Sequence, residues 1–126
     1  MGRVVSIKRE VIDSLLSYAQ IFHPKEGILL LRGTTRKGAV NITGTVIPPL
    51  ATHSYNFSSF PFFMLPIDPS IVGVAHSHPS GAKRPSIEDL NNFYGSLMAI
   101  VAYPYKTEED IVIFDRDGNT LKFNVI

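Results

Sequence analysis

The order of the segments that the sequence predicts is that of an α/β sandwich, built on one mixed and largely antiparallel sheet. Three observations lead to this class. One early segment has the apolar spacing of an amphipathic helix, a second helix follows a strand that ends in histidines, and the other apolar segments are short and joined by turns. At 126 residues, 44% of them hydrophobic, the chain has the size and core of one domain. We therefore expect residues 1–126 to form a single α/β domain.

The N-terminal half predicts a strand, a helix and two paired strands. Residues 3–7 are β-like, and the helix after them ends at a His-Pro dipeptide. The apolar positions of the helix recur at helical spacing, at Ile12, Leu15, Leu16, Ala19 and Phe22. Residues 27–32 then predict a buried strand, residues 33–38 a turn, and residues 39–47 a second strand. Because the connection is too short for a crossover, this pair of strands is predicted to be antiparallel.

The C-terminal half predicts four strands and a helix. Residues 71–76 form a near-continuous apolar strand, and a helix begins near Ser86 and runs to about Tyr94. The remaining strands cover residues 97–102, 111–114 and 120–125. A tight Asp-Gly turn joins the last two of these strands. Between the two halves, residues 50–69 show no regular pattern apart from a β-like stretch at residues 52–57.

Composition and charge exclude several classes of function. The formal net charge is only +1 and the 12 basic residues are scattered, so no nucleic-acid surface is predicted. No apolar run approaches the ~20 residues that cross a bilayer, and we expect no membrane association. The absence of cysteine rules out disulfides, a cysteine nucleophile and cysteine-ligated zinc. The sequence therefore predicts a cytoplasmic protein in which any metal is bound by histidine and carboxylate.

Two histidines and an aspartate have the spacing of a metal site. His76 and His78 are two residues apart at the end of an apolar strand, where alternate side chains share a face. Asp89 follows on the first turn of the next predicted helix, and the connecting loop can fold it back to the strand end. Two imidazoles and one carboxylate, with a fourth position open for water, are the composition of a catalytic zinc site. Zinc lowers the pKa of a bound water to about 7 and polarises carbonyl groups.

Each part of this pattern has a simpler explanation when it is taken alone. A His-x-His sequence at a strand end can be ordinary surface polarity. Ser86 and Asp89 before an apolar helix match a capping box, with Ser86 as the N-cap. Together, however, the residues form His-x-His-Pro-x6-Ser-x2-Asp, a combination that is improbable by chance in a chain of 126 residues.

This pattern resembles the signature of the JAMM (MPN+) zinc metalloproteases, in which an upstream Glu precedes His-x-His-Pro-x6-Ser-x2-Asp. Every position of the signature is present, and the matching order of elements covers nearly the whole chain. The sequence is most similar to the small stand-alone archaeal members, which are deubiquitinase-like proteases. Four further segments are shared with them, at residues 23–26, 64–67, 84–86 and 102–105. The resemblance implies a cytidine-deaminase-like α/β sandwich with a curved sheet and two main helices.

The resemblance also implies a role for each residue of the signature. His76, His78 and Asp89 would bind one Zn²⁺ per chain, and Glu26 would act as the general acid/base. Glu26 lies at the edge of an apolar strand, where partial desolvation would raise its pKa. Without the downstream motif it would be taken for a solvated turn residue. Ser86 would stabilise the oxyanion through its hydroxyl while it also caps the helix.

The implied activity is zinc-dependent hydrolysis of the bond after the C-terminal Gly-Gly of a ubiquitin-like protein, in lysine conjugates or linear fusions. The residues by themselves indicate only zinc-assisted amide hydrolysis. Two alternatives stay open: processing of a sulfur-carrier protein with a β-grasp fold, and a non-catalytic MPN scaffold. A zinc deaminase is disfavoured because its His-x-Glu and Pro-Cys-x-x-Cys pattern is missing.

The partners and the remaining polar residues are less constrained by the sequence. A ubiquitin-like protein or its conjugates are expected as substrate, and a homodimer is left open. The aromatic segment from Phe57 to Leu65 is explained most simply as core or dimer contact. Alternatively, it forms a hydrophobic wall that packs an extended peptide tail. His23 and His53 have no partner at metal-ligand spacing, and residues 108–110 predict a solvated turn.

Overall fold

The computed structural model describes residues 3–48, 68–91 and 93–126. Its first half contains β1 (Val4–Ile7), α1 (Arg9–Phe22), β2 (Ile28–Arg36) and β3 (Ala39–Val46). Its second half contains β4 (Ile71–His78), α2 (Ile87–Asn91), β5 (Leu97–Ala102), the 3-10 helix η3 (Glu108–Asp110), β6 (Ile111–Phe114), β7 (Thr120–Leu121) and β8 (Phe123–Val125). The β-like residues 52–57, His53 and the segment from Phe57 to Leu65 lie outside the described residues.

Eight strands of the described residues form one sheet in the order β7-β6-β5-β4-β2-β3-β1-β8. β2 pairs antiparallel with β3 and with β4, and β6 pairs antiparallel with β5 and with β7. The pairs β1–β3, β1–β8 and β4–β5 are parallel. The sheet is thus mixed and mostly antiparallel, and the predicted antiparallel pairing of residues 27–32 with residues 39–47 is confirmed.

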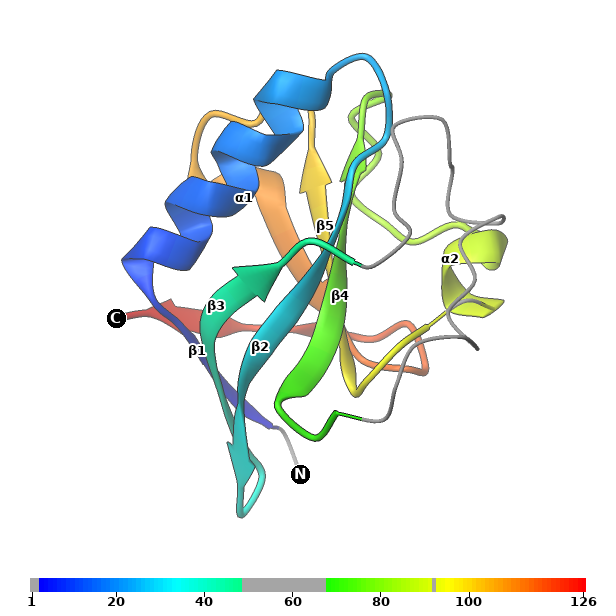
Figure 1. The fold of residues 1–126 in the computed structure, drawn as a ribbon. Helices are drawn as coiled ribbons and strands as arrows, with labels where there is room; N and C mark the ends of the chain where they lie inside the picture. Colours follow the sequence, from blue (N-terminus) through cyan, green and yellow to red (C-terminus); the bar gives the residue numbers. More distant parts are fainter. Residues whose placement is uncertain (1–2, 49–67, 92) are drawn as a thin grey trace.

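The two helices lie on opposite sides of this sheet (Figure 1). α1 places its buried side chains in the larger core cluster, together with Leu29, Ala75 and Val101 of the sheet. The opposite face carries a second, smaller cluster that includes Ile28, Leu30, Val74, Met98, Ile100 and Phe114. α2 lies on that second side, beside the end of β4. The sheet therefore separates a face covered by a 14-residue helix from one that has a helix of only 5 residues.

The last predicted strand, residues 120–125, is wrong as a single element. Residues 120 and 121 form β7 at one edge of the sheet, whereas residues 123–125 form β8 at the other edge. Only Lys122 separates the two strands, so the two edges of the sheet must come close together. This is possible because the sheet is strongly curved around α1, and one short segment then pairs with β6 and with β1 in succession.

Three boundaries also differ from the prediction. β2 continues to Arg36 because Thr34 and Thr35 pair with β3, and the turn is reduced to Lys37 and Gly38, both with positive φ. β4 continues to His78, two residues beyond the predicted end. α2 ends at Asn91 rather than near Tyr94, and Gly95, at φ 78°, turns the chain into β5.

No helix among the described residues combines the length and the apolar character that crossing a membrane requires.

Candidate metal centre

The central strand β4 ends in the two predicted metal-ligating histidines. It lies between β2 and β5, and all of its residues from Ile71 to His78 are buried. His76 pairs with Ile28 of β2, and His78 pairs with Ala102 of β5, which explains why the strand extends to His78. His76 and His78 are 0% and 7% exposed, and their imidazoles share the face of the sheet on which α2 lies. The apolar strand thus places both imidazole rings on one face of the sheet, at the C-terminal end of β4.

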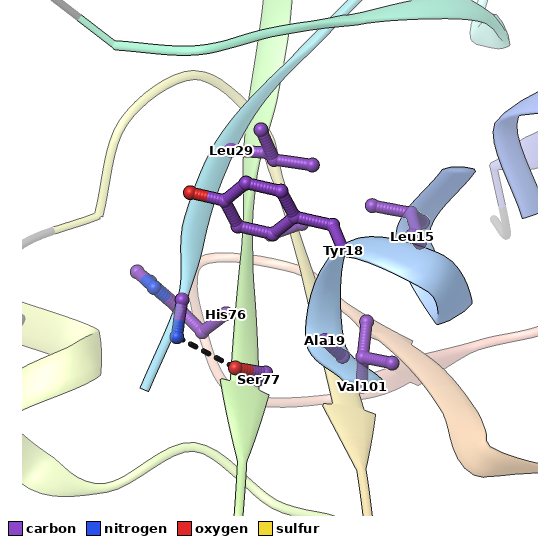
Figure 2. A pocket seen from close by; sticks show the side chains of 9 residues that line it. Leu15, Tyr18, Ala19, Leu29, His76, Ser77 and Val101 are labelled. Atoms are coloured by element: carbon purple, nitrogen blue, oxygen red, sulfur yellow. Dashed lines mark hydrogen bonds between the residues drawn. The ribbon is translucent and has the colours of Figure 1, made fainter. Parts of the chain in front are cut away.

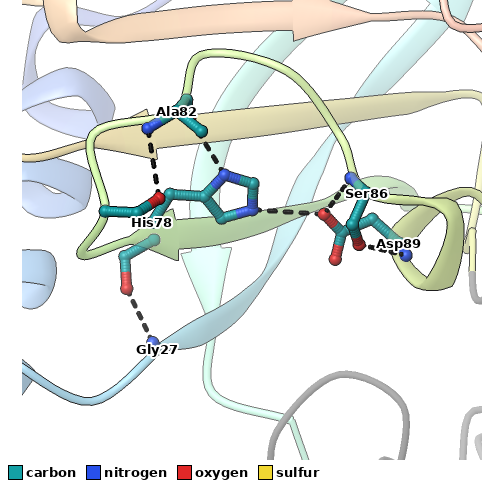
Figure 3. A network of polar contacts seen from close by, with 7 residues as sticks. Gly27, His78, Ala82, Ser86 and Asp89 are labelled. Atoms are coloured by element: carbon teal, nitrogen blue, oxygen red, sulfur yellow. Dashed lines mark hydrogen bonds and ion pairs between the residues drawn. The ribbon is translucent and has the colours of Figure 1, made fainter.

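His78 makes two contacts that orient its ring (Figure 3). Its Nδ1 lies 3.0 Å from the carbonyl oxygen of Ala82, and since a carbonyl only accepts, Nδ1–H is the donor. Its Nε2 lies 3.1 Å from Oδ2 of Asp89. The loop after β4 therefore fixes the ring so that Nε2 faces the carboxylate. In metal-binding proteins, a ligating histidine characteristically donates its other ring N–H to a carbonyl or carboxylate in this way.

Ser86 and Asp89 form the predicted capping box at the start of α2. The backbone N–H of Ser86 donates to Asp89 Oδ2 over 2.8 Å, and the backbone N–H of Asp89 donates to Ser86 Oγ over 3.0 Å. These reciprocal bonds satisfy backbone donors that a helix start leaves without partners. They also hold Asp89, which is 1% exposed, against His78. The cap and the metal-ligand interpretation of Asp89 are therefore compatible, because one carboxylate oxygen serves both contacts.

Burial and mutual contact shift the pKa values of these three groups. Burial lowers the pKa of His76 well below its ordinary value, although the charge of Asp89 opposes the shift, so the ring is neutral. Burial also acts to lower the pKa of His78, but its bonds to Asp89 and Ala82 outweigh burial and raise it. Burial acts to raise the pKa of Asp89, yet the bonds from His78 and Ser86 lower it overall. His76 and Asp89 are therefore in the forms that bind metals, a neutral imidazole and an ionised carboxylate, whereas the contacts of His78 favour its protonated form, which releases a proton when a metal binds.

The chemistry of these donors fits zinc. Two ligand atoms that each lie about 2.0–2.1 Å from one tetrahedral zinc are separated by about 3.4 Å. The 3.1 Å between His78 Nε2 and Asp89 Oδ2 is close to that separation. Among the described residues, however, no three His, Asp or Glu side chains converge closely enough to hold an ion together. The structure thus brings two of the three predicted ligands into contact, and the three-ligand centre stays a prediction.

Glu26, the predicted acid/base, lies in the turn of residues 23–26 between α1 and β2. Its side chain is exposed, not partly desolvated as expected, because this turn lies at the surface before β2 becomes buried. Its charge still acts on His78 and on Tyr105, which places it on the side of the β4 end. The next residue, Gly27, donates its backbone N–H to Ser77 Oγ over 2.6 Å (Figure 3). The Glu26 turn is therefore attached to the histidine-bearing strand.

Two groups of residues near the site were not predicted from the sequence. Ser77 occupies the middle position of the His-x-His motif, and the alternation of the strand points it away from the histidine face. That alternation is the signal in the sequence that could have placed Ser77 on the face opposite to the histidines, and the structure shows that α1 covers this face. His23 was expected to have no partner at metal-ligand spacing. In the structure its Nδ1 lies 2.9 Å from the Tyr105 hydroxyl and its ring stacks on Tyr103 at 4.8 Å.

Comparison with known proteins identifies the family. Residues 8–116 match the Prok-JAB model, which describes prokaryotic homologs of the JAB domain. The chain belongs to this family. A relative from Haloferax volcanii, described as a probable metalloprotease, is 32% identical over 131 residues, covering 98% of this chain and 80% of that protein.

Solved structures agree with the Prok-JAB assignment. A JAB1/MPN domain protein from Archaeoglobus fulgidus has 31% identity and a TM-score of 0.72, covering 96% of this chain and 98% of that one. A structure described as JAMM, a metalloprotease-like zinc site in the proteasome and signalosome, has 28% identity and a TM-score of 0.69, covering 98% of each chain. A protein from Desulfitobacterium hafniense, at 17% identity and a TM-score of 0.66 over 98% of this chain and 93% of that one, supports the fold alone. The predicted JAMM/MPN fold, an α/β domain with a curved sheet and two helices, is confirmed.

Proposed function

We propose that this Prok-JAB protein is a zinc-dependent metallohydrolase that cleaves the bond after the C-terminal Gly-Gly of ubiquitin-like proteins. Its substrates are lysine conjugates or linear fusions of these modifiers, met in the cytoplasm, and residues 1–126 act as one catalytic domain that holds one zinc. The observation that carries the metallohydrolase is the buried pairing of His78 Nε2 with Asp89 Oδ2, on the same strand end as His76. The relative described as a probable metalloprotease supports the same class. The choice of a ubiquitin-like substrate rests on the resemblance of the signature to JAMM isopeptidases.

His76, His78 and Asp89 are the residues that would hold the metal. Zinc bound there would supply a Lewis acid and make water acidic near neutral pH. The Ala82 carbonyl keeps the His78 ring in the tautomer whose Nε2 faces the site. The Ser86 backbone N–H likewise holds Asp89 Oδ2 in position.

Glu26 transfers the proton, and Ser86 stabilises the negative charge that develops on the substrate. Glu26 accepts a proton from the attacking water and donates it to the leaving amine, so it acts first as base and then as acid. Ser86 Oγ accepts a hydrogen bond from the Asp89 N–H, so its own O–H can be donated elsewhere. That proton stabilises the oxyanion that forms when the amide carbonyl is attacked. In this scheme no covalent bond forms between the chain and its substrate.

The test combines metal content and cleavage on one purified sample. Wild-type protein should contain one zinc per chain and cleave a Gly-Gly-Lys isopeptide of a ubiquitin-like protein. Glu26→Gln should keep the zinc and lose about 10³-fold or more in turnover, because the ligands are intact while the acid/base is gone. Glu10→Gln, which changes an exposed glutamate of α1, is the matched control and should cleave normally.

Other outcomes would redirect the proposal. Cleavage that survives complete zinc removal by a chelator would overturn the zinc mechanism. If the protein binds zinc but cleaves only a sulfur-carrier protein, the proposed substrate class is wrong and the zinc-dependent hydrolysis stands. A chain that binds no zinc would be a scaffold. Size-exclusion chromatography with light scattering, run on the same sample, decides whether the active form is a homodimer.

A further inference from the structure

We propose that Ser77, the middle residue of the His-x-His motif, is a positioning residue that holds the turn of residues 23–26 and thereby Glu26. This inference rests on the proposed function, in which Glu26 is the general acid/base. Ser77 does not face the metal ligands. Its side chain lies on the α1 side of β4, in a small hollow lined also by Leu15, Tyr18, Ala19 and Leu29 (Figure 2).

The main contact is a short hydrogen bond to the residue after Glu26. Gly27 N–H donates to Ser77 Oγ over 2.6 Å in a buried position. The Ser77 backbone N–H donates in return to the Gly27 carbonyl oxygen over 3.1 Å. The first residue beyond Glu26 is thus bonded twice to one residue of β4. A displacement of the Glu26 backbone relative to the histidines would therefore strain these bonds.

Helix α1 packs against Gly27 on the side opposite to β4. A Cβ atom on Gly27 would lie 2.7 Å from Cε2 of the Tyr18 ring and 3.3 Å from Ser77 Oγ. The Tyr18 ring therefore lies directly against the Gly27 backbone, and glycine is required for the close approach. The hollow beside these residues has a volume of only about 10 Å³, about that of one water molecule. Gly27 is thus packed closely between Tyr18 of α1 and Ser77 of β4.

The upstream end of the turn is attached as well. Tyr105, 1% exposed, lies with its hydroxyl 2.9 Å from His23 Nδ1, and its carbonyl oxygen accepts a 2.6 Å hydrogen bond from Gln20 Nε2. Tyr105 follows the end of β5, the strand that pairs with β4. The turn that carries Glu26 is therefore attached at both ends to the strands that position the metal ligands. An exposed acid/base needs such an attachment, since a misplacement of about 1 Å can cost about 100-fold in rate.

The activity test removes the Ser77 hydroxyl. In Ser77→Ala, kcat should fall about 10- to 100-fold while KM and zinc content stay unchanged. Ser77→Cys should act in the same direction, because it keeps the bulk of the side chain and accepts a hydrogen bond only weakly. The matched control is Ser96→Ala, which removes a hydroxyl bonded to the Val72 carbonyl at the other end of β4 and should leave kcat unchanged.

A double-mutant cycle separates positioning from a structural role. In a Glu26→Gln background, measured under single-turnover conditions, Ser77→Ala should cause no further loss, because the residue that it positions no longer acts. Tyr105→Phe should behave in the same way with a smaller effect, because it removes only the hydroxyl contact with His23 and keeps the backbone contact with Gln20. An equal loss from Ser77→Ala in both backgrounds would overturn the positioning role, as would a wild-type kcat in Ser77→Ala.

A second readout does not depend on turnover. Hydrogen exchange at the Gly27 amide, followed by NMR in zinc-free and zinc-loaded protein, should be about 2- to 10-fold faster in Ser77→Ala than in wild type. Ser96→Ala should leave the Gly27 exchange rate unchanged. Unaltered Gly27 exchange in Ser77→Ala would overturn the attachment. If wild-type protein binds zinc but cleaves no substrate, the proposed function fails, and the Gly27 exchange rate still decides whether Ser77 holds the turn.

Discussion

Two capping boxes of the same design, Ser86–Asp89 and Thr107–Asp110, differ in what surrounds them. In each, the side chain of the first residue accepts from a backbone N–H of the helix, and the aspartate accepts from the N–H of the first residue. Both aspartates are buried, at 1% and 9% exposure. Asp89 faces His78 of β4, whereas the charged neighbour of Asp110 is Lys83, with 3.9 Å between Nζ and Oδ1.

The difference shows that the cap by itself carries no chemistry. Local hydrogen bonds form both boxes, because any Ser or Thr followed by Asp three residues later can satisfy a helix start. What makes Asp89 a metal-ligand candidate is the strand end opposite to it, where an imidazole nitrogen lies 3.1 Å away. The second box therefore serves as an internal control for the first, because its aspartate is paired with a lysine and with no histidine of the described residues.

The largest contrast is expected between Asp89→Asn and Asp110→Asn. The first substitution removes a carboxylate ligand, so zinc affinity should fall by more than about 100-fold and turnover should be lost with the metal. The second should keep both zinc and turnover. Metal analysis and isopeptide cleavage on both variants measure the contrast. Retention of zinc by Asp89→Asn would remove Asp89 from the ligand set.

A smaller contrast is expected between Ser86→Ala and Thr107→Ala. Each loses its cap, at a cost of about 0.5–2 kcal/mol in the free energy of unfolding. Only Ser86→Ala should also lose about 10²- to 10³-fold in kcat, because it removes the proposed oxyanion donor. Denaturant unfolding and steady-state kinetics separate the two effects. Similar kcat values in both variants would mean that Ser86 only caps the helix and does not stabilise the oxyanion.

A pH effect should also distinguish the first box. The bond to Asp89 raises the pKa of His78, so in metal-free protein its stabilisation is fully present below about 6.5, the ordinary value, and is lost as pH rises through the raised pKa. His76, whose pKa is lowered, makes stability rise with pH while its unfolded form loses its proton around pH 6.5, and it adds no slope well above that value. The Tm of metal-free protein should therefore fall as the pH rises above 6.5 through the raised pKa of His78.

The same scan on Asp89→Asn tests the assignment of this slope. The substitution removes the carboxylate that stabilises protonated His78, so the decline in Tm above about pH 6.5 should become shallower. Asp110→Asn should keep the wild-type slope. An identical decline in wild type and Asp89→Asn would show that the His78–Asp89 pair is not its source.

The smallest effect is expected in the loop that leads from β4 to the first box. Lys83 donates to the Glu109 carbonyl over 3.0 Å and lies 3.9 Å from Asp110, but its side chain is 49% exposed. Because solvent screens such contacts, Lys83→Met should lower the free energy of unfolding by less than about 1 kcal/mol and leave zinc content unchanged. A larger loss, measured by urea unfolding, would mean that the two boxes stabilise one another through this loop.

Local patterns in the sequence were sufficient for much of the fold. The spacing of Ile12, Leu15 and Ala19 predicted α1, because an amphipathic helix is defined by neighbours three and four residues apart. The capping box at Ser86 and the antiparallel pairing of β2 with β3 were predicted for the same reason, since each depends on residues close in the chain. The signature also led to the JAMM/MPN family before any geometry was considered.

Predictions failed where distant segments decide the outcome. Residues 120–125 have one continuous β pattern, but the curvature of the sheet divides them between its two edges. Residues 108–110 were expected to form a solvated turn, yet Asp110 is buried as the third residue of a second cap. Glu26 was expected to be partly desolvated and is exposed, because the turn before β2 lies at the surface.

The sequence by itself determined which residue types are present and their order along the chain: two histidines, a serine and an aspartate at the spacing of a zinc hydrolase, after an upstream glutamate. Only the tertiary structure decided which of them meet. It placed His78 against Asp89, buried His76 on the same strand, and attached Gly27 to Ser77 across 50 residues of chain. The physical reason is that a hydrogen bond or a coordination bond forms within about 3 Å. Pairing of β2 with β4 brings Gly27 to Ser77, and the loop after β4 brings Asp89 to His78.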